Sequence, residues 1–223
     1  LLTGCAITAL IQSSSASTVM VVSFVNAGLM TLGQSMAVIF GANVGTTFTA
    51  WIIAIFGFKV NMSMFILPLI GLAVVLLFMN KSKTKSIGEF VIGFAFLFMG
   101  LDMISTYVPD LQNNPEMFEV LRDYASMGFR SVLLFALVGL VLTMVIQSSA
   151  ATFAITLIMC TKGWITFDLA CALVLGSNIG TTITPILASM SGNVAAKRTA
   201  MGHLLFNLLG TMWCLCVFIP FAG

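Results

Sequence analysis

Two stretches of this sequence carry the same polar motif, and their spacing indicates how the chain is organised. Thr8–Ser14 reads T-A-L-I-Q-S-S and Thr143–Ser149 reads T-M-V-I-Q-S-S, so the two glutamines are 147 − 12 = 135 positions apart. The stretches G-A-N-V-G-T-T from Gly41 and G-S-N-I-G-T-T from Gly176 are separated by the same 135 positions. Shared hydrophobicity does not reproduce Gln, Ser, Asn, Gly and Thr in order. The sequence therefore predicts an internal duplication.

The duplication extends over most of the chain. Residues 4–49 and 139–184 align without a gap and share 16 identities in 46 positions. Adding 135 to the apolar segment 62–80 gives 197–215, in the last apolar segment. Subtracting 135 from the segment 87–107 gives positions before Leu1, so we expect repeat 1 to lack its first span here. We divide the chain into repeat 1, residues 1–80, and repeat 2, residues 81–223.

The composition is that of an integral membrane protein. Hydrophobic residues make up 60% and charged residues 7% of the chain, and its mean hydropathy is +1.13. A soluble domain carries about 25% charged residues, so this surface must face lipid, and we expect a multi-pass protein of the plasma (inner) membrane. The net charge of +2 indicates no nucleic-acid partner. The five cysteines lie in apolar segments without paired spacing, which favours buried thiols over disulfides or a zinc site.

Several segments are long enough to span a bilayer, which takes about 20 apolar residues. Three are uninterrupted: 60–80, 87–107 and 197–220. Two more, 32–56 and 167–190, contain the glycine-asparagine motif, and we expect interrupted helices there because glycine loosens a helix. The acidic segment 108–128 is expected to be a polar extracellular connection.

The Gln-Ser-Ser motifs predict re-entrant hairpins. The apolar arms 1–11 and 16–25 are too short to span a bilayer at about 1.5 Å per residue, so each hairpin should turn near the midplane. A complete repeat then has three crossings and one hairpin, and the odd number inverts repeat 2 relative to repeat 1. The predicted fold class is an all-α membrane protein with two inverted-topology repeats, each with a re-entrant helical hairpin and an interrupted transmembrane helix.

Loop charges predict the orientation in the membrane. Basic residues gather on one face of the predicted topology, and we place that face in the cytoplasm by the positive-inside rule. These residues are Lys81, Lys83, Lys85, Lys197 and Arg198. The first hairpin then enters from the cytoplasm and the second from outside.

The polar motifs can bind ions at the midplane. Helix N-termini and hydroxyl groups suit an anion, and the hydroxyls near the start of the second half-helices are those of Ser13, Ser14, Ser15, Ser148 and Ser149. Oxygen ligands for sodium come from free carbonyls and from Gln12, Gln147, Asn43 and Asn178. Neither motif contains Lys or Arg, so the charge of a bound anion would need a co-bound cation.

Two further ionisable residues lie in apolar segments. Asp102 is expected to be an interfacial acid or part of a coupling path. His203 is the single histidine, and a packed or interfacial role is favoured over a proton relay.

The paired motifs resemble those of the type II sodium/phosphate cotransporters, especially the compact bacterial members. The resemblance rests on Thr8–Thr18 with Thr143–Thr152 and on the two glycine-asparagine stretches. It implies a non-enzymatic, sodium-coupled symporter of inorganic phosphate without a cofactor, operating by elevator-like alternating access. The serines above would contact phosphate. Sodium binding or bracing of the tips would fall to Gln12, Gln147, Asn43, Asn178, Thr47 and Thr182.

The second tip departs from this pattern, because Ala150 stands where the first tip has Ser15. Spacing alone also fits a sodium-coupled carrier of another anion, such as a dicarboxylate, or a passive anion channel. An intramembrane enzyme with a serine nucleophile is disfavoured, because no acid or histidine lies beside Gln-Ser-Ser. The sequence leaves the oligomeric state open, a homodimer being one arrangement.

Overall fold

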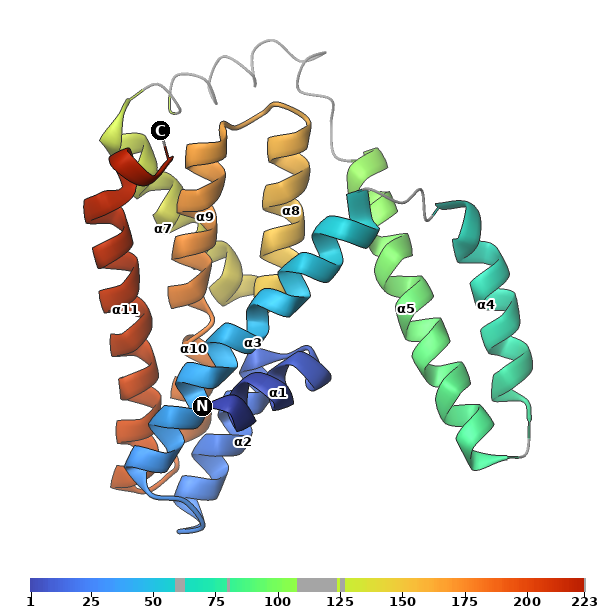
Figure 1. Ribbon diagram of the computed structural model, residues 1–223, viewed down its shortest axis with the longest axis horizontal. Coiled ribbons are helices and arrows are strands. Elements are labelled where there is room, and N and C mark those ends of the chain that lie inside the picture. The colour runs from blue at the N-terminus through green and yellow to red at the C-terminus, as the bar shows by residue number, and fades with distance from the viewer. Residues whose placement is uncertain (59–62, 80, 108–123, 125–126, 223) are drawn as a thin grey trace. The chain divides into compact units, whose positions relative to one another are not determined.

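The computed structural model describes residues 1–58, 63–79, 81–107, 124, 127 and 128, and 129–222, and every regular element in them is a helix (Figure 1). The helices are α1 (Leu2–Ile11), α2 (Ser14–Asn26), α3 (Leu32–Phe58), α4 (Ser63–Leu77), α5 (Ser82–Tyr107), α7 (Phe129–Ile146), α8 (Ser149–Thr161), α9 (Phe167–Gly180), α10 (Ile183–Ser189) and α11 (Val194–Ala222). Of the predicted polar connection 108–128, all but residues 124, 127 and 128 lies outside the described residues.

Four segments in the described ranges are long and apolar enough to cross a membrane. They are Leu32–Ile55, Phe129–Ile146, Phe167–Ser189 and Val194–Val217. The described part of α4 is a shorter apolar helix of 15 residues. These helices and the low charge support the conclusion that the chain is a membrane protein.

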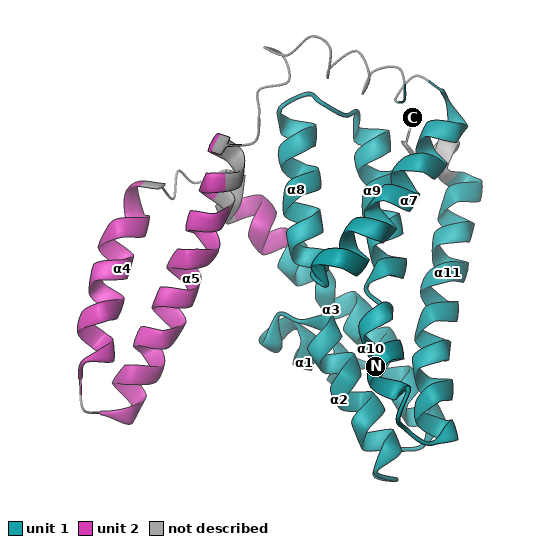
Figure 2. Cartoon of the chain, turned by 180° about the vertical axis from the view of Figure 1, so that it is seen from behind, with its two compact units in different colours: residues 1–50, 114–223 teal, residues 51–113 magenta. Residues whose placement is uncertain are grey.

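The chain forms two compact units, shown in two colours in Figure 2. Unit 1 contains residues 1–50 and 114–223, and unit 2 contains residues 51–113. The predicted repeat boundary at residue 80 falls inside unit 2, because repeats follow sequence similarity and compact units follow packing. The division into repeats stays a prediction.

Unit 2 is built around a pair of neighbouring helices, α4 and α5 (Figure 2). Ala73 and Ala95 are fully buried, and Gly88 lets the backbones of the two helices approach closely, since an added Cβ would lie 3.0 Å from the amide nitrogen of Leu77.

Glycines bring helices of unit 1 into backbone contact at equivalent places in the two copies. A Cβ added at Gly41 of α3 would collide with the carbonyl of Leu1, and one added at Gly176 of α9 would collide with the carbonyl of Ala136 in α7.

The prediction that these motifs break both helices is wrong for the first copy. There α3 runs without interruption from Leu32 to Phe58, and Gly41 serves close packing instead.

The second copy is interrupted, and a proline explains the difference. Helix α9 ends at Gly180 and α10 begins at Ile183. Pro185 has no N–H to donate and its ring excludes the carbonyl four residues earlier, that of Thr181. The equivalent position in the first copy is Ala50, which continues α3.

The arms around the two Gln-Ser-Ser turns differ in length. Helix α7, the first arm of the second copy, has 18 residues and is long enough to span a membrane. The re-entrant hairpins are predicted from the arms 1–11 and 16–25, which are about half that length. The second arms, α2 and α8, each have 13 residues. Figure 1 shows α2 and α8 running in opposite directions away from their turns.

Apolar contacts and a hydrogen bond hold together the helices that surround the two turns. Apolar side chains between α7 and α9 form a core that includes Phe135 and Leu173, and Val22 of α2 packs against Ala196 and Ala200 of α11. At the far end of α2, the Asn193 amide N–H donates to Asn26 Oδ1 over 2.8 Å. Helix α2 of the first copy is therefore joined to α11 of the second.

Candidate functional site

The two glutamines end their helices in the same unusual conformation. Gln12 has φ 58° and ψ 25°, and Gln147 has φ 56° and ψ 26°. Among the described non-glycine residues, these two have positive φ. Each backbone N–H donates to a carbonyl four residues earlier, Thr8 at 2.8 Å and Thr143 at 2.7 Å. Left-handed backbone costs a non-glycine residue about 1–2 kcal/mol, and the chain adopts it at the same position in both copies.

A serine caps the following helix in each copy. Ser13 Oγ accepts the N–H of Ala16, and Ser148 Oγ accepts the N–H of Ala151, both over 3.2 Å. Helices α2 and α8 begin at the next serine, Ser14 and Ser149, within the serine stretch where the sequence places their starts. A cap uses the oxygen of the hydroxyl, so the O–H hydrogen stays available to another acceptor.

Both turns line one small cavity of about 60 Å³. Its lining contains Gln12, Ser13, Ser14, Ser15, Thr46, Thr49, Gln147, Ser148, Ser149 and Ala150. The space exceeds what one water molecule requires. The structure therefore brings the five predicted serines and both glutamines to one place.

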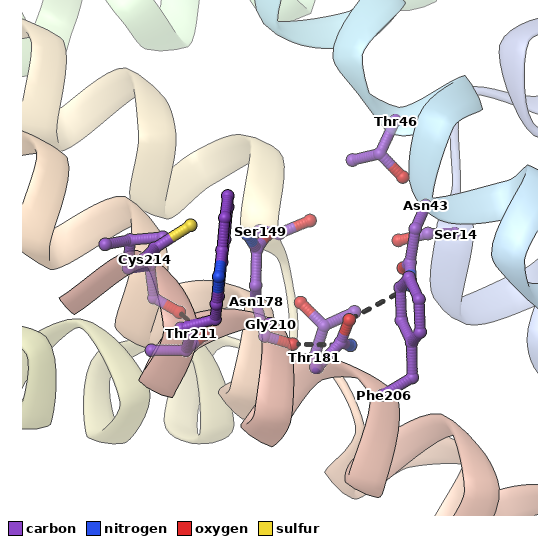
Figure 3. Close-up of a pocket in the computed structure, with 13 residues that line it drawn as sticks. Ser14, Asn43, Thr46, Ser149, Asn178, Thr181, Phe206, Gly210, Thr211 and Cys214 are labelled. Atoms are coloured by element: carbon purple, nitrogen blue, oxygen red, sulfur yellow. Dashed lines mark hydrogen bonds between the residues drawn. The ribbon is translucent and has the colours of Figure 1, made fainter. Parts of the chain in front are cut away.

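A larger cavity of about 260 Å³ is lined by three residues of the small one, Ser14, Thr46 and Ser149. Its other lining residues are Asn43, Leu175, Asn178, Thr181, Phe206, Asn207, Gly210, Thr211, Trp213 and Cys214. In Figure 3, Ser14, Asn43 and Thr46 of the first copy lie on one side, with Ser149 of the second copy opposite. The lining of both cavities consists of neutral residues, so an ion there meets dipoles and hydroxyls.

Asparagines connect the two copies beside this cavity. Asn43 Nδ2 donates to Asn207 Oδ1 over 3.0 Å, and Asn207 Nδ2 donates to the backbone carbonyl of Asn178 over 3.0 Å. His203 is fully buried, with Nε2 3.0 Å from Asn207 Nδ2. The predicted packed role of His203 agrees with this position.

The two threonines predicted to bind sodium or brace the tips lie outside both cavity linings. Thr47 Oγ1 donates to the Val44 carbonyl and Thr182 Oγ1 to the Ile179 carbonyl, each over 2.7 Å. The preceding threonines, Thr46 and Thr181, line the larger cavity instead. Helical periodicity does not predict which threonine of each pair faces the cavity, because residues three and four positions after an asparagine both lie on the same helix face as that asparagine.

Sequence reasoning also missed the polar side of α11. Thr199, His203, Asn207 and Thr211 recur every four residues in an apolar helix, and all four are buried. Three of them hydrogen-bond to other helices of unit 1, as Thr199 does to Ser35 Oγ of α3 over 3.1 Å, and His203 is hydrogen-bonded to Asn207. This spacing, which puts polar groups on one helix face, is the signal that identifies Asn207.

A hydroxyl cluster distinguishes the second copy from the first. Thr143 Oγ1 is hydrogen-bonded to Thr152 Oγ1 at 2.9 Å and to Ser177 Oγ at 2.8 Å. The equivalent hydroxyl, that of Thr8, is buried without a partner in the described part of the chain. Ser177 is replaced at the equivalent position by Ala42.

Known proteins resemble this chain along most of its length. The family model described as Na+/Pi-cotransporter matches residues 1–106 and 115–218. The uncharacterized protein YqeW of Bacillus subtilis (strain 168) is 35% identical over 203 residues, 91% of this chain and 63% of YqeW. YjbB of Escherichia coli (strain K12), named for inorganic phosphate export, is 33% identical over 221 residues, 98% of this chain and 38% of YjbB.

A shorter match connects the chain to an animal protein. Sodium-dependent phosphate transport protein 2C of Homo sapiens is 37% identical over 90 residues, 39% of this chain and 15% of that protein. No solved structure matches the chain significantly. The chain spans 63% of YqeW and 38% of YjbB, so it corresponds to part of each bacterial relative. Taken with the paired serine turns at one cavity, the match of the family model over nearly the whole sequence shows that the chain belongs to the Na+/Pi-cotransporter family.

Proposed function

We propose that this chain forms the ion-binding part of a transporter that carries inorganic phosphate across the plasma membrane with sodium. One observation carries the proposal: Ser14 and Ser149, equivalent residues of the two copies, line the same cavities. The family membership and the printed names of the relatives support phosphate as the substrate class.

The anion would bind where two helices begin. Helices α2 and α8 present their N-termini, with partial positive charge, at the small cavity. The amides in the first turn have no carbonyl earlier in the helix, and the serine hydroxyls add donors. Such a set of neutral donors suits a tetrahedral oxyanion, whose oxygens accept hydrogen bonds in several directions.

Sodium would bind to oxygens beside the anion. Helices α1 and α7 end at the glutamines, so their last carbonyls bring partial negative charge close to the same cavity. The Gln12 side chain folds back, its Nε2 donating to the Ala9 carbonyl. Because the cavity linings carry no charge, a co-bound cation lowers the cost of burying phosphate, which is our physical reason for coupling.

Alternating access would use the duplicated architecture. The opposite directions of α2 and α8 support inverted repeats, divided at residue 80, whose turns enter from opposite faces of the membrane. Both cavities are lined by residues of unit 1, which supports an elevator-like movement that carries the site as a whole.

The test is uptake of labelled phosphate into proteoliposomes that contain the full-length protein, with and without an inward sodium gradient. We expect saturable, sodium-dependent uptake that arsenate inhibits and succinate does not. Inhibition by succinate would support a dicarboxylate carrier, and conduction without coupling would support a channel.

A second candidate function is phosphate export, and the similarity to YjbB over 98% of this chain favours it. Export would move phosphate outward along its own gradient or another ion's. Proteoliposomes preloaded with phosphate separate the two directions: efflux that proceeds without sodium on either side supports export, whereas sodium-dependent uptake supports symport.

A further inference from the structure

Asn207 connects the glycine-asparagine motifs of both copies. It accepts a hydrogen bond from the Asn43 side chain of α3 and donates one to the Asn178 carbonyl of α9, each over 3.0 Å. Asn207 is buried, with 8% of its surface exposed, and all three asparagines line the larger cavity. The dashed lines in Figure 3 include the hydrogen bonds at this point.

The backbone carbonyl of Asn178 fixes the orientation of the two side-chain amides that are hydrogen-bonded in a row from it, those of Asn207 and Asn43. A carbonyl only accepts, so the Asn207 side chain must turn its NH₂ group toward Asn178 and its oxygen toward Asn43. Asn43 must then present its own NH₂ group to Asn207. The carbonyl oxygen of the Asn43 side chain, Oδ1, is left for another partner.

His203 does not satisfy that oxygen. Its Nε2 lies 3.0 Å from Asn207 Nδ2, a donor, so Nε2 is the accepting nitrogen of a neutral imidazole. The ring proton is then on Nδ1, which has no partner among the described residues. Nε2 is 3.4 Å from Asn43 Oδ1 but has no hydrogen to give it. Among the described residues, Asn43 Oδ1 therefore has no donor, as expected of a ligand of a hard cation.

We propose that Asn207 and His203 are positioning residues that orient Asn43 so that its oxygen, and not its NH₂ group, is available to sodium. The inference rests on the proposed function, because it takes sodium to be the ion that Asn43 Oδ1 binds. It adds two residues of α11, which would influence sodium binding by orienting Asn43.

One such device serves the whole site. At the positions 135 residues earlier, repeat 1 has Leu72 for Asn207 and Pro68 for His203, and neither side chain can make these hydrogen bonds. Repeat 1 therefore offers the Asn178 side chain no equivalent of the orienting residues Asn207 and His203. Sodium affinity should then depend more on Asn43 than on Asn178.

The experiment is a double-mutant cycle on the full-length protein, with the half-saturating sodium concentration for phosphate uptake as the readout. Asn207→Leu, which copies Leu72, should raise this concentration about three- to tenfold, the effect of losing one orienting hydrogen bond. Asn43→Ala should raise it at least as much. The double variant should resemble Asn43→Ala alone, because Asn207 acts through Asn43.

Additive effects, or an unchanged sodium dependence in Asn207→Leu, overturn the inference. If Asn207→Leu does not accumulate in the membrane, Asn207→Ser replaces it, because serine is too short to reach both partners, and the same outcomes apply. Thr199→Val is the control, since Thr199 lies on the same face of α11 but bonds Ser35 and lines neither cavity. Its sodium dependence should match the wild type. Phosphate uptake by the wild type that ignores sodium would instead refute the proposed function.

Discussion

The hydroxyl groups of Thr143 and Ser177 lie 2.8 Å apart and join α7 to α9. In the first copy Ala42 stands in place of Ser177, and the buried hydroxyl of Thr8 has no partner among the described residues. The two copies therefore have the same backbone design but unequal polar cores. An unsatisfied buried hydroxyl costs about 1–3 kcal/mol, so this asymmetry should appear in stability.

Thr143→Val and Thr8→Val form a matched pair. Thr143→Val removes a partner from two buried hydroxyls and should lower the free energy of unfolding by about 1–3 kcal/mol. Thr8→Val removes a buried hydroxyl for which the described part of the chain offers no partner, so it should be neutral or stabilising. Thermal unfolding of the purified protein in detergent compares them, and equal losses would contradict the difference between the copies.

Gly176→Ala should prevent the close packing of α7 and α9. The added methyl group collides with the Ala136 carbonyl, so the helices must separate. We expect a large drop in the amount of folded protein in the membrane, as with Gly41→Ala in the first copy. Gly93→Ala in α5 is the control, since nothing lies within 4 Å of its Cβ position. The explanation fails if all three variants accumulate like the wild type.

Ser14→Ala and Ser149→Ala should each reduce phosphate uptake at least tenfold, because each removes a hydroxyl donor worth about 1.5 kcal/mol or more to a charged ligand. Ser23→Ala in α2 should transport normally, since Ser23 bonds the Val19 carbonyl and lines neither cavity. Initial rates normalised to protein in the membrane give the comparison. Normal rates in either tip variant would remove that serine from the site.

Thr46→Val should affect transport more than Thr47→Val. Thr46 lines both cavities, whereas Thr47 lines neither and bonds the Val44 carbonyl. The half-saturating concentrations of sodium and phosphate should change for Thr46→Val only. A larger effect of Thr47→Val would restore the assignment made from the motif.

The sequence predicts the helix starts well, because each depends on local chemistry that both copies share. Ser14 and Ser149 begin α2 and α8 within the serine stretch expected to start them, and the glutamines before the serines end α1 and α7. The glycine-asparagine motif was less informative. A glycine can weaken a helix or admit a neighbouring backbone, and sequence alone does not distinguish these uses. Pro185, which has Ala50 as its equivalent, is the residue that separates the interrupted copy from the continuous one.

The candidate site was predicted in part for a similar reason. The serines and glutamines come together as their matched positions suggested, but Asn207 belongs to a distant helix. Its contact with Asn43 spans 164 residues and follows from tertiary packing. Polar residues repeated every four positions in α11 mark its buried face without identifying its partners.

The two copies should together build one phosphate site, and the stoichiometry of phosphate binding tests this arrangement. Labelled phosphate should bind the purified full-length protein in saturating sodium with one site per chain. Ser14→Ala and Ser149→Ala should each weaken that single site. Two sites per chain, with each variant losing one and leaving the other intact, would show instead that each copy builds a site of its own.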